Sequence, residues 1–341
     1  MKNRIDSSRK KTPWENSNNI TNTQLFIKKV YKDNYIKKHP ALLEINENDI
    51  LNNIEIKQCT YCNSFNIKKY GKTRSKLQVY FCKNCNRRFT PTTGTIFENH
   101  KISITEWVEF LLDIFIFNYS STSLASKKNR NNINTSIFWL NKVFLLLKGC
   151  QNSVILKNTV YIDEFFCSVI KSDLKTKDGK KLSGLSKNQY CIGIWYDKQN
   201  IVVTVEGMGK TSIERTNDTF MKHIEPESHI IHDDKKSHIE LIEKLRLIDE
   251  SYKSTYLKTL DYKENPLRPI NHQCDLIRQF LNTHSGFDRK YLQDYLNLYC
   301  FMNSKPNDKL EKVNILLNLA LTKKATLYYR ELFGLEENKN H

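Results

Sequence analysis

Two short apolar runs, each ending in a pair of carboxylates, constrain the fold of this chain most. They read V-Y-I-D-E at 160–164 and I-I-H-D-D at 230–234. Such a run is typical of a buried strand that delivers an oxygen ligand to a site in a sheet. Two of these strands side by side would bring Asp163 and Asp233 together, and two hard oxygen ligands suit Mg²⁺ or Mn²⁺ better than zinc. An acid after a strand is also common as a turn residue or helix cap, so either run alone fits both interpretations.

The chain from residue 155 to 303 has the sequence pattern of an α/β domain. Its apolar spacing predicts strands at 159–167, 190–196, 200–206, 229–232 and 254–260, and helices at 213–223, 237–247, 272–283 and 288–303. Three strands, helix, strand, helix, strand, helix is the order of the ribonuclease H-like fold, in which the first and fourth strands are central neighbours. Asp163 and Asp233 fall on those two strands. We therefore expect a ribonuclease H-like α/β domain with a mixed sheet and flanking helices.

A third polar position comes from I-N-H-Q-C-D-L-I-R at 270–278. Asn271 can cap the helix that follows, and Arg278 stands seven residues later, about two turns on and so on nearly the same face. An oxygen ligand and a cation on one face suit a metal next to a phosphate. A helix cap followed by a surface arginine explains the same two residues without any site.

Four of the nine cysteines form two C-x-x-C pairs, Cys59 with Cys62 and Cys82 with Cys85. Each pair can offer two thiolates to one tetrahedral Zn²⁺. Because four thiolates leave no coordination position for a substrate, we expect a structural zinc ribbon at residues 55–98. The other cysteines are scattered singly, which is the usage of a reduced compartment and not of a disulfide framework. A redox C-x-x-C would need a surrounding βαβ pattern, and none is seen.

The charge of the chain favours a nucleic acid as partner. Its 341 residues include 54 Lys+Arg against 37 Asp+Glu, a formal net charge of +17, and aromatic residues are interleaved with the basic ones. An A/T-rich genome also enriches Asn, Ile and Lys, so charge alone does not identify the partner. The strongest apolar run, at 110–117, is too short for a bilayer and contains Asp113. With no secretory signal visible, we expect a cytoplasmic protein that has no membrane partner.

Residues 99–150 are expected to be helical and to bind DNA. A short helix at 120–126, a polar turn, and a longer helix at 135–148 with Trp139 and Lys142 fit a helix-turn-helix after a first helix at 105–119. The apolar spacing in the longer helix fits any packed helical hairpin equally well. Outside these parts we expect a basic arm with a helical segment at 1–54 and a helical tail at 304–341.

Several longer motifs accompany these features. They are F-C-x-x-C-x-x-x-F-T and T-G-T-I-F in the ribbon, Y-I-D-E-F-F in the first strand, G-L-S-K-N-Q at 184–189, H-D-x-x-x-S-H at 232–238 and G-F-x-x-x-x-L-Q-D-Y-L-N at 286–297. In this combination the chain resembles the ISXO2-like insertion-sequence transposases over about residues 55–303. The resemblance implies that Asp163 and Asp233 are the two catalytic aspartates. It also places Asn271 where many DDE transposases have glutamate, and Arg278 where the family usually has lysine.

The resemblance implies a DDE-type transposase that cleaves and transfers DNA strands. Asp163, Asp233 and Asn271 would hold Mg²⁺ or Mn²⁺, with Arg278 on a phosphate oxygen. The ribbon and the helical region would bind terminal inverted repeats, and the protein would act as a homodimer or larger assembly on double-stranded element ends and target DNA, associated with the nucleoid. Two other classes stay open, a transposase-derived DNA-binding regulator without catalysis and a ribonuclease H-like nuclease without strand transfer.

Two assignments within the site also stay open at this point. Asp275 is an alternative to Asn271 as the third ligand. Asp234 is an alternative to Asp233, although the apolar run ends at His232 and favours Asp233.

Overall fold

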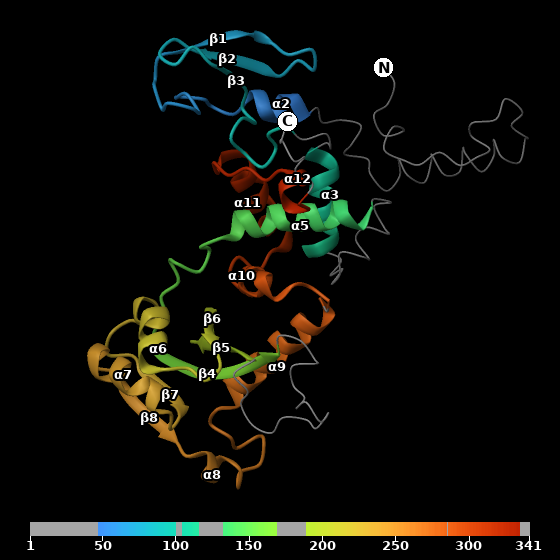
Figure 1. Ribbon diagram of the computed structural model, residues 1–341. Helices are drawn as coiled ribbons and strands as arrows, with labels where there is room; N and C mark the ends of the chain where they lie inside the picture. The colour runs from blue at the N-terminus through green and yellow to red at the C-terminus, as the bar shows by residue number, and fades with distance from the viewer. Residues whose placement is uncertain (1–46, 100–103, 116–131, 169–188, 285, 335–341) are drawn as a thin grey trace, which may run out of the picture. The chain divides into compact units, whose positions relative to one another are not determined.

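The computed structural model describes residues 47–99, 104–115, 132–168, 189–284 and 286–334 (Figure 1). Contacts divide the chain into two units. One unit contains the cysteine pairs and the end of the chain, and the other contains a five-stranded sheet. The division falls within three helices, α3 (Ile104–Phe115), α5 (Ile133–Leu147) and α11 (Lys309–Thr322). Residues 1–46 of the basic arm and helical segment expected at 1–54, and nearly all of the G-L-S-K-N-Q motif, lie outside the described residues.

The first unit begins with a small antiparallel sheet that carries the cysteine pairs. Its strands are β1 (Ile67–Lys72), β2 (Gln78–Cys82) and β3 (Arg88–Phe89), in that order. Tyr80 stacks on Phe89 with ring centroids 5.6 Å apart, and both are buried between the strands and the cysteines. The short helix α2 (Glu47–Asn52) closes the turn between β1 and β2, because Asn52 Oδ1 accepts from the Gln78 N–H at 2.7 Å.

The T-G-T-I-F motif forms a buried turn after this sheet. Thr95, Ile96 and Phe97 are at most 2% exposed, and Phe97 packs edge-on against Trp107 of α3 at 5.3 Å. Gly94 has a φ of +76°, and a Cβ there would come within 2.8 Å of the Thr60 methyl group. Glycine is therefore required at this position by both its backbone conformation and the space around it. The motif serves packing rather than chemistry.

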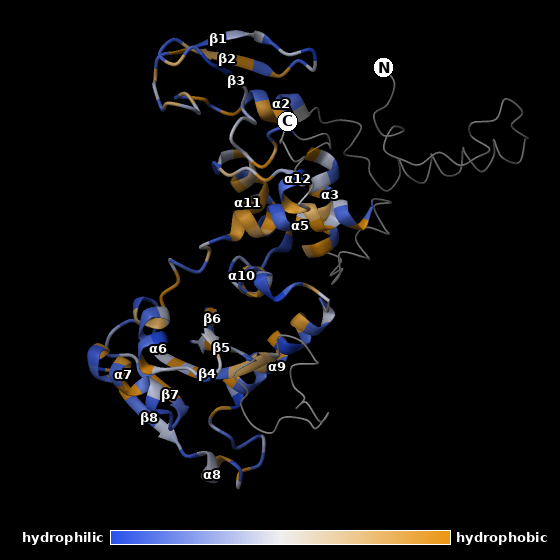
Figure 2. Cartoon of the chain, in the orientation of Figure 1, coloured by the Kyte–Doolittle hydropathy of each residue, from blue (hydrophilic) through white to orange (hydrophobic). Residues whose placement is uncertain are grey.

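The helical region contains α3 and α5, and Figure 2 shows that much of both helices is hydrophobic. Phe110 of α3 packs edge-on against Trp139 of α5 at 5.3 Å. The predicted helices at 105–119 and 135–148 are confirmed as far as they are described, while the short helix at 120–126 lies outside the described residues. Trp139 and Lys142 are only 2% and 4% exposed. These two side chains therefore cannot read DNA, and DNA binding by this region stays a prediction.

The second unit is built on a mixed sheet of five strands. They are β4 (Thr159–Ser168), β5 (Gln189–Tyr196), β6 (Ile201–Met208), β7 (His229–Asp233) and β8 (Ile248–Tyr252), in the spatial order β6-β5-β4-β7-β8. The first three pair antiparallel, whereas β7 pairs parallel with both β4 and β8. The first and fourth strands of the domain are thus central neighbours, as the predicted element order requires.

Helices cover both faces of this sheet (Figure 1). On one face, α6 (Ile213–Phe220) and α7 (Ile239–Leu245) pack on alternate residues of the strands, with Phe220 stacked on Trp195 at 4.3 Å. The other helices against the sheet are α9 (Arg268–Thr283), which contacts β4 and β5, and α10 (Leu292–Asn303), which contacts β6. Because side chains alternate along a strand, neighbouring residues of β4 face different helices. The chain then continues through α11 to α12 (Tyr329–Leu332).

The strand predicted at 254–260 is wrong. The fifth strand is β8, five residues long and ending at Tyr252, and the helix α8 (Ser254–Leu257) follows it. β8 is an edge strand whose residues are exposed or half-buried, with the sequence I-D-E-S-Y. Such a strand lacks the apolar alternation by which a half-buried strand is recognised. None of the described helices is long and apolar enough to cross a membrane.

Candidate functional site

The parallel pairing of β4 and β7 brings two of the predicted site residues together. Ile162 lies opposite His232 in the register, so the next residues, Asp163 and Asp233, come together at the same level of the sheet. β7 ends at Asp233, but β4 continues to Ser168 along β5. Asp163 therefore lies within its strand and not at the end, because the antiparallel neighbour extends β4 beyond the last parallel pair.

Lys235 joins the carboxylates of this level into one cluster. Its Nζ lies 3.0 Å from Asp163 Oδ1 and 2.9 Å from Asp233 Oδ2, and it also contacts Glu164 Oε2. The Lys235 side chain is 34% exposed, whereas that of Glu164 is 3% exposed. We call the three carboxylates the acidic centre.

Burial and charge act in opposite directions on this cluster. Burial raises the pKa of Asp163, and the ammonium group of Lys235 offsets only part of that rise. Burial also disfavours the charge of Glu164, but the hydrogen bond from His238 and the charge of Lys235 outweigh it and lower the pKa of Glu164 to about 2. Burial would lower the pKa of Lys235, yet the three carboxylates raise it above its usual range. Lys235 is thus held as an ammonium ion.

Behind the acidic centre, two buried histidines link Glu164 to the exposed Asp249 through a chain of hydrogen bonds. Glu164 Oε1 accepts from His238 Nε2 at 2.9 Å, the Nδ1 atoms of His238 and His232 are 2.9 Å apart, and His232 Nε2 lies 2.8 Å from Asp249 Oδ1. His232 and His238 are 3% and 1% exposed. The H-D-x-x-x-S-H motif therefore contributes a ligand candidate, Asp233, and two histidines that fix the carboxylate of Glu164.

Helix α9 covers the other side of Asp163. Cys274 Sγ lies 3.9 Å from Asp163 Oδ2, and one turn later the guanidinium of Arg278 lies 5.1 Å from the centre of the Phe165 ring. Asn271 is half-buried and precedes Cys274 by three residues, which places it on the same face of the helix. The predicted third position thus belongs to the helix that packs over Asp163.

The expectation that Asn271 caps this helix is wrong. α9 begins at Arg268 with Leu267 as N-cap and a proline in the first turn, so Asn271 is already inside the helix. Its N–H bonds to the Leu267 carbonyl at 3.0 Å. Proline is favoured at the start of a helix because its missing N–H has no partner there anyway. A capping role therefore no longer competes with a ligand role for Asn271.

The two alternative acids are placed less favourably. Asp275 is exposed and pairs with Arg278 at 3.0 Å. Asp234 is also exposed, and its backbone N–H bonds to the Tyr252 carbonyl at 3.2 Å. Neither is among the acids that gather around Asp163 in the described part of the chain.

The acidic centre has the donor set of a divalent-cation site. Asp163, Glu164 and Asp233 can each offer one oxygen such that the three atoms lie within 4.8 Å of one another. Asp233 Oδ1 is buried without a hydrogen-bond partner among the described residues, so one lone pair faces no donor there. Three carboxylates with an unused buried oxygen suit a hard cation such as Mg²⁺ or Mn²⁺.

Another acid, which is buried, lies on the α6 face of the sheet near Glu164. Glu206 of β6 is 8% exposed, and its Oε2 accepts hydrogen bonds from Thr211 and Thr216. Burial, and then the negative charge of Glu164, raise the pKa of Glu206 to about 8. Its carboxylate lies over Gly193, where any side chain would collide with Glu206 Oε1.

The four cysteines of the first unit also form one cluster. Cys59 Sγ lies 3.6 Å from Cys85 Sγ, Cys62 Sγ lies 3.6 Å from Cys82 Sγ, and all four sulfur atoms lie within 4.8 Å of one another. Sulfur atoms about 3.8 Å apart are what a tetrahedral ion with bonds of about 2.3 Å requires. The cluster therefore fits one tetrahedral metal ion.

The backbone around the pairs supports this fit. Asn63 and Asn86, which directly follow the two pairs, have φ angles of 57° and 55°, a left-handed conformation that asparagine tolerates better than most residues. The turn lets the Tyr61 N–H point at Cys59 Sγ at 3.4 Å. N–H groups aimed at sulfur stabilise a thiolate rather than a thiol.

Sequence reasoning missed several residues of the site. Lys235 stands at an unspecified position of the H-D-x-x-x-S-H motif, and Glu206 carried no signal beyond its place near the end of a predicted strand. Glu164 and His238 were visible as motif letters, but nothing in the sequence joined them. The hydrogen bond between them links residues 74 positions apart.

The chain was also compared with known proteins. No protein-family model matches it. A stretch of 120 residues is 26% identical to an uncharacterised protein in transposable element ISH50 of Halobacterium salinarum. The stretch covers 35% of this chain and 38% of that protein, so the chain matches well under two thirds of the relative's length.

Among solved structures, the chain is similar to two complexes of Mos1. The Mos1 strand transfer complex matches with a TM-score of 0.27 and 9% identity over 67% of this chain and 82% of that one. The Mos1 mariner paired-end complex with Mn matches with a TM-score of 0.28 and 12% identity over 62% of this chain and 74% of that one. Scores of this size are too low to establish a common fold. What the comparisons give is a weak sequence similarity to a protein of a transposable element.

Proposed function

We propose that this protein is a DNA transposase of an insertion sequence, with a ribonuclease H-like catalytic domain that cleaves and joins DNA strands with the help of a divalent cation. The observation that carries the proposal is the meeting of Asp163 and Asp233, which share one ammonium group at 3.0 and 2.9 Å from neighbouring parallel strands. Two carboxylates on adjacent central strands are an arrangement that phosphoryl-transfer chemistry can use. The similarity to a protein in transposable element ISH50 agrees with it.

Asp163 and Asp233 would hold Mg²⁺ or Mn²⁺, and Glu164 is a further oxygen donor. When bound, such an ion stabilises charge on a phosphoryl oxygen and makes water or a 3′-hydroxyl a better nucleophile. Glu164 is kept in place by His238 and Lys235, so the centre can hold its geometry before DNA arrives. Asn271 on α9 can contribute a neutral oxygen, and Arg278 can bind a phosphate oxygen.

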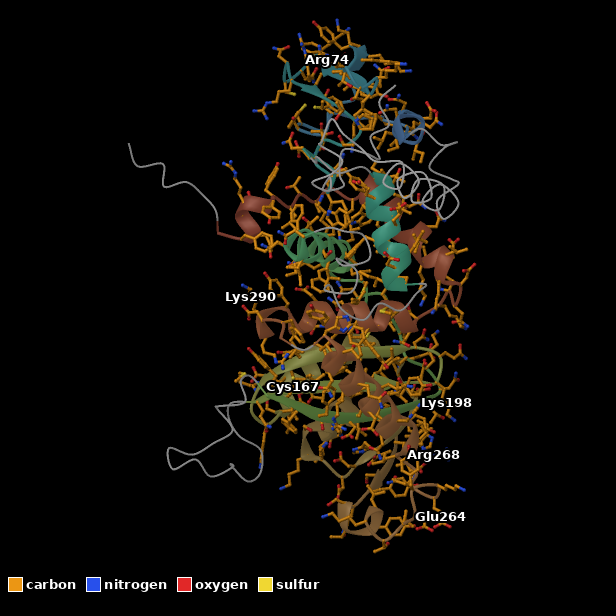
Figure 3. The ribbon with its side chains drawn as sticks, turned by 90° about the vertical axis from the view of Figure 1, so that its right-hand side faces the viewer. Arg74, Cys167, Lys198, Glu264, Arg268 and Lys290 are labelled. Carbon is orange, nitrogen blue, oxygen red and sulfur yellow. The ribbon has the colours of Figure 1, made fainter. Side chains whose placement is uncertain are left out.

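The cysteine cluster is proposed to bind a structural Zn²⁺ and to make the small sheet a DNA-binding zinc ribbon. Residues 56–97 contain nine basic side chains and no acidic one. The guanidinium of Arg88 on β3 lies 4.3 Å from the centre of the Tyr70 ring on β1, and the ammonium group of Lys68 lies 5.5 Å from the centre of the Phe81 ring on β2. An exposed Tyr70 ring and a half-buried Phe81 ring with cations over them suit both phosphates and bases. Arg74, labelled in Figure 3, lies in the turn after β1 and is exposed.

The proposal is tested with purified protein, DNA carrying the end of the flanking element, and Mg²⁺. Wild type should nick the end and join it to a second duplex. Asp163→Asn and Asp233→Asn should abolish both steps while DNA binding persists, since the basic surface is untouched. Asp234→Asn is the matched control and should stay active.

Other results of this assay would contradict the proposal. Binding of the end without any metal-dependent nicking would indicate a DNA-binding regulator. Nicking without joining would indicate a nuclease. Activity in Asp233→Asn together with inactivity in Asp234→Asn would move the ligand by one residue.

A further inference from the structure

The ammonium group of Lys235 occupies the position in which the acidic centre would bind a cation. Its Nζ bonds to Asp163 Oδ1 at 3.0 Å and to Asp233 Oδ2 at 2.9 Å, and it contacts Glu164 Oε2 as well. These three carboxylates are the same ones whose oxygen atoms converge within 4.8 Å. A single side chain therefore takes up one oxygen of every carboxylate in the centre.

We propose that Lys235 is an internal counter-ion that neutralises the acidic centre in the metal-free protein and must withdraw its ammonium group before a divalent cation can bind there. This inference rests on the proposed function, because it takes the acidic centre to be the metal site. An ion bound to Asp163 and Asp233 would compete with Lys235 for the same carboxylates. It would also be repelled by the ammonium charge at close range.

Such a counter-ion answers a problem that any buried acidic site has. Three carboxylates with one shared partner would repel one another in its absence, and Glu164 is 97% buried. Lys235 supplies the opposite charge from within the chain, and its side chain is 34% exposed, so the flexible stem has a route to solvent. Once displaced, the ammonium group is free to bind a phosphate of the DNA. Metal loading and DNA contact would in this way be linked through one residue.

The counter-ion role is specific to Lys235 and is not shared by the neighbouring lysine. Lys236 is the next residue along the chain, starts the 3₁₀ turn that leads to α7, and is exposed. It carries the same charge, but no described ion pair joins it to the acidic centre. Lys236→Met is therefore a matched control for charge, chain position and side-chain size.

The test is a Mn²⁺ titration of full-length, zinc-loaded protein without DNA, with free Mn²⁺ followed by electron paramagnetic resonance. Lys235→Met should bind Mn²⁺ on the order of 10-fold more tightly than wild type, because the competing charge is gone. Lys235→Arg should bind as weakly as wild type, because its charge persists. Lys236→Met should be indistinguishable from wild type.

Stability gives a second measurement that does not depend on the titration. Without Mn²⁺, Lys235→Met should melt at a lower temperature than wild type because the carboxylates then repel one another. Saturating Mn²⁺ should raise the melting temperature of Lys235→Met more than that of wild type. A loss of stability that Mn²⁺ does not restore would overturn the inference and make Lys235 a purely structural partner of Glu164.

The outcomes separate the two proposals. If wild type binds Mn²⁺, and Asp163→Asn does not, but Lys235→Met binds no more tightly than wild type, the counter-ion role is overturned and the metal site stands. If neither wild type nor Lys235→Met binds more Mn²⁺ than Asp163→Asn does, the acidic centre is not a metal site and both proposals fail.

Discussion

His238 and His232 face each other through their Nδ1 atoms at 2.9 Å inside the protein. Two lone pairs or two N–H groups at that distance would repel, so the two atoms share one proton. The Nε2 atoms face Glu164 and Asp249, and each donates to its carboxylate when that group is ionised. The two rings thus lie between the carboxylates of Glu164 and Asp249.

This arrangement predicts that His238→Ala destabilises the protein strongly. The substitution leaves Glu164 Oε1 and His232 Nδ1 buried without their partner, which costs about 2–4 kcal/mol of unfolding free energy. His229→Ala on β7 is the control, because His229 pairs with Glu250 where both side chains are about a third exposed, and its loss should cost less than about 1 kcal/mol. Urea unfolding of the two variants measures the difference. Equal losses of unfolding free energy in the two variants would show that the hydrogen bonds of His238 contribute no more to stability than the His229–Glu250 pair does.

The raised pKa of Glu206 predicts a stability that falls with rising pH. Folding raises this pKa from 4.5 to about 8, so the folded protein holds the proton more tightly than the unfolded chain does. The stabilisation is then fully present below pH 4.5 and is lost as the pH rises through about 8. Glu206→Gln should remove this dependence and gain stability relative to wild type by up to on the order of 4 kcal/mol at pH 8 and above.

Denaturant unfolding of both proteins between pH 5 and 9 measures the difference in unfolding free energy. The gain predicted above is an upper bound, because the unfolded chain retains some structure. The exposed Glu243 on α7 offers the control Glu243→Gln, which should follow wild type at every pH. If the difference between Glu206→Gln and wild type does not change with pH, Glu206 does not titrate in this range.

The main features of the sheet were predictable from the sequence because buried strands leave strong local patterns. The runs that contain Asp163 and Asp233 are apolar on both sides of the sheet, and the order of elements then made their strands neighbours. Edge strand β8 was missed because it buries little and has no such pattern. The cysteine cluster was predictable from spacing alone, since two C-x-x-C pairs leave few other arrangements.

The inner partners of the site could not be predicted in this way. Alternation along β4 sends Asp163 and Glu164 to different faces of the sheet, so the sequence alone would place only one of them in the site. Both reach the centre because Lys235, from the turn after β7, lies between them. Nothing in the sequence shows that Lys235 rather than Lys236 reaches the acidic centre, because the backbone of that turn decides which side chain points there. The start of α9 was likewise set by the proline and not by Asn271.

The cysteine cluster predicts one structural zinc ion per chain. Cys59→Ser should lose the zinc and unfold the small sheet, because Cys59 is fully buried in its core and removal of one thiolate breaks the tetrahedral set. Binding of element-end DNA should weaken with it, while the acidic centre still binds Mn²⁺. Zinc content by elemental analysis and DNA affinity by titration measure both effects. Cys167→Ser is the control, because Cys167 lies on β4 outside the cluster (Figure 3) and should keep its zinc.

The position of Asn271 inside α9 makes its proposed role as a ligand directly testable. Because it is not the cap, Asn271→Ala should not lose the roughly 1 kcal/mol that a capping side chain contributes, and alanine is the better helix former. We therefore expect unchanged or slightly higher stability together with strongly reduced cleavage of element-end DNA in single turnover. Asn271→Asp should keep partial activity, because an oxygen of equal reach remains.

The exposed acid one turn later supplies the control. Asp275→Ala removes the partner of Arg278 at the surface and should cleave at nearly the wild-type rate, while Arg278→Lys should be tolerated better than Arg278→Ala because the charge survives. The decisive comparison is therefore between Asn271→Ala and Asp275→Ala at equal stability. A wild-type rate in the first and an inactive second protein would transfer the third ligand from Asn271 to Asp275, and would require α9 to turn its exposed face toward the acidic centre when DNA binds.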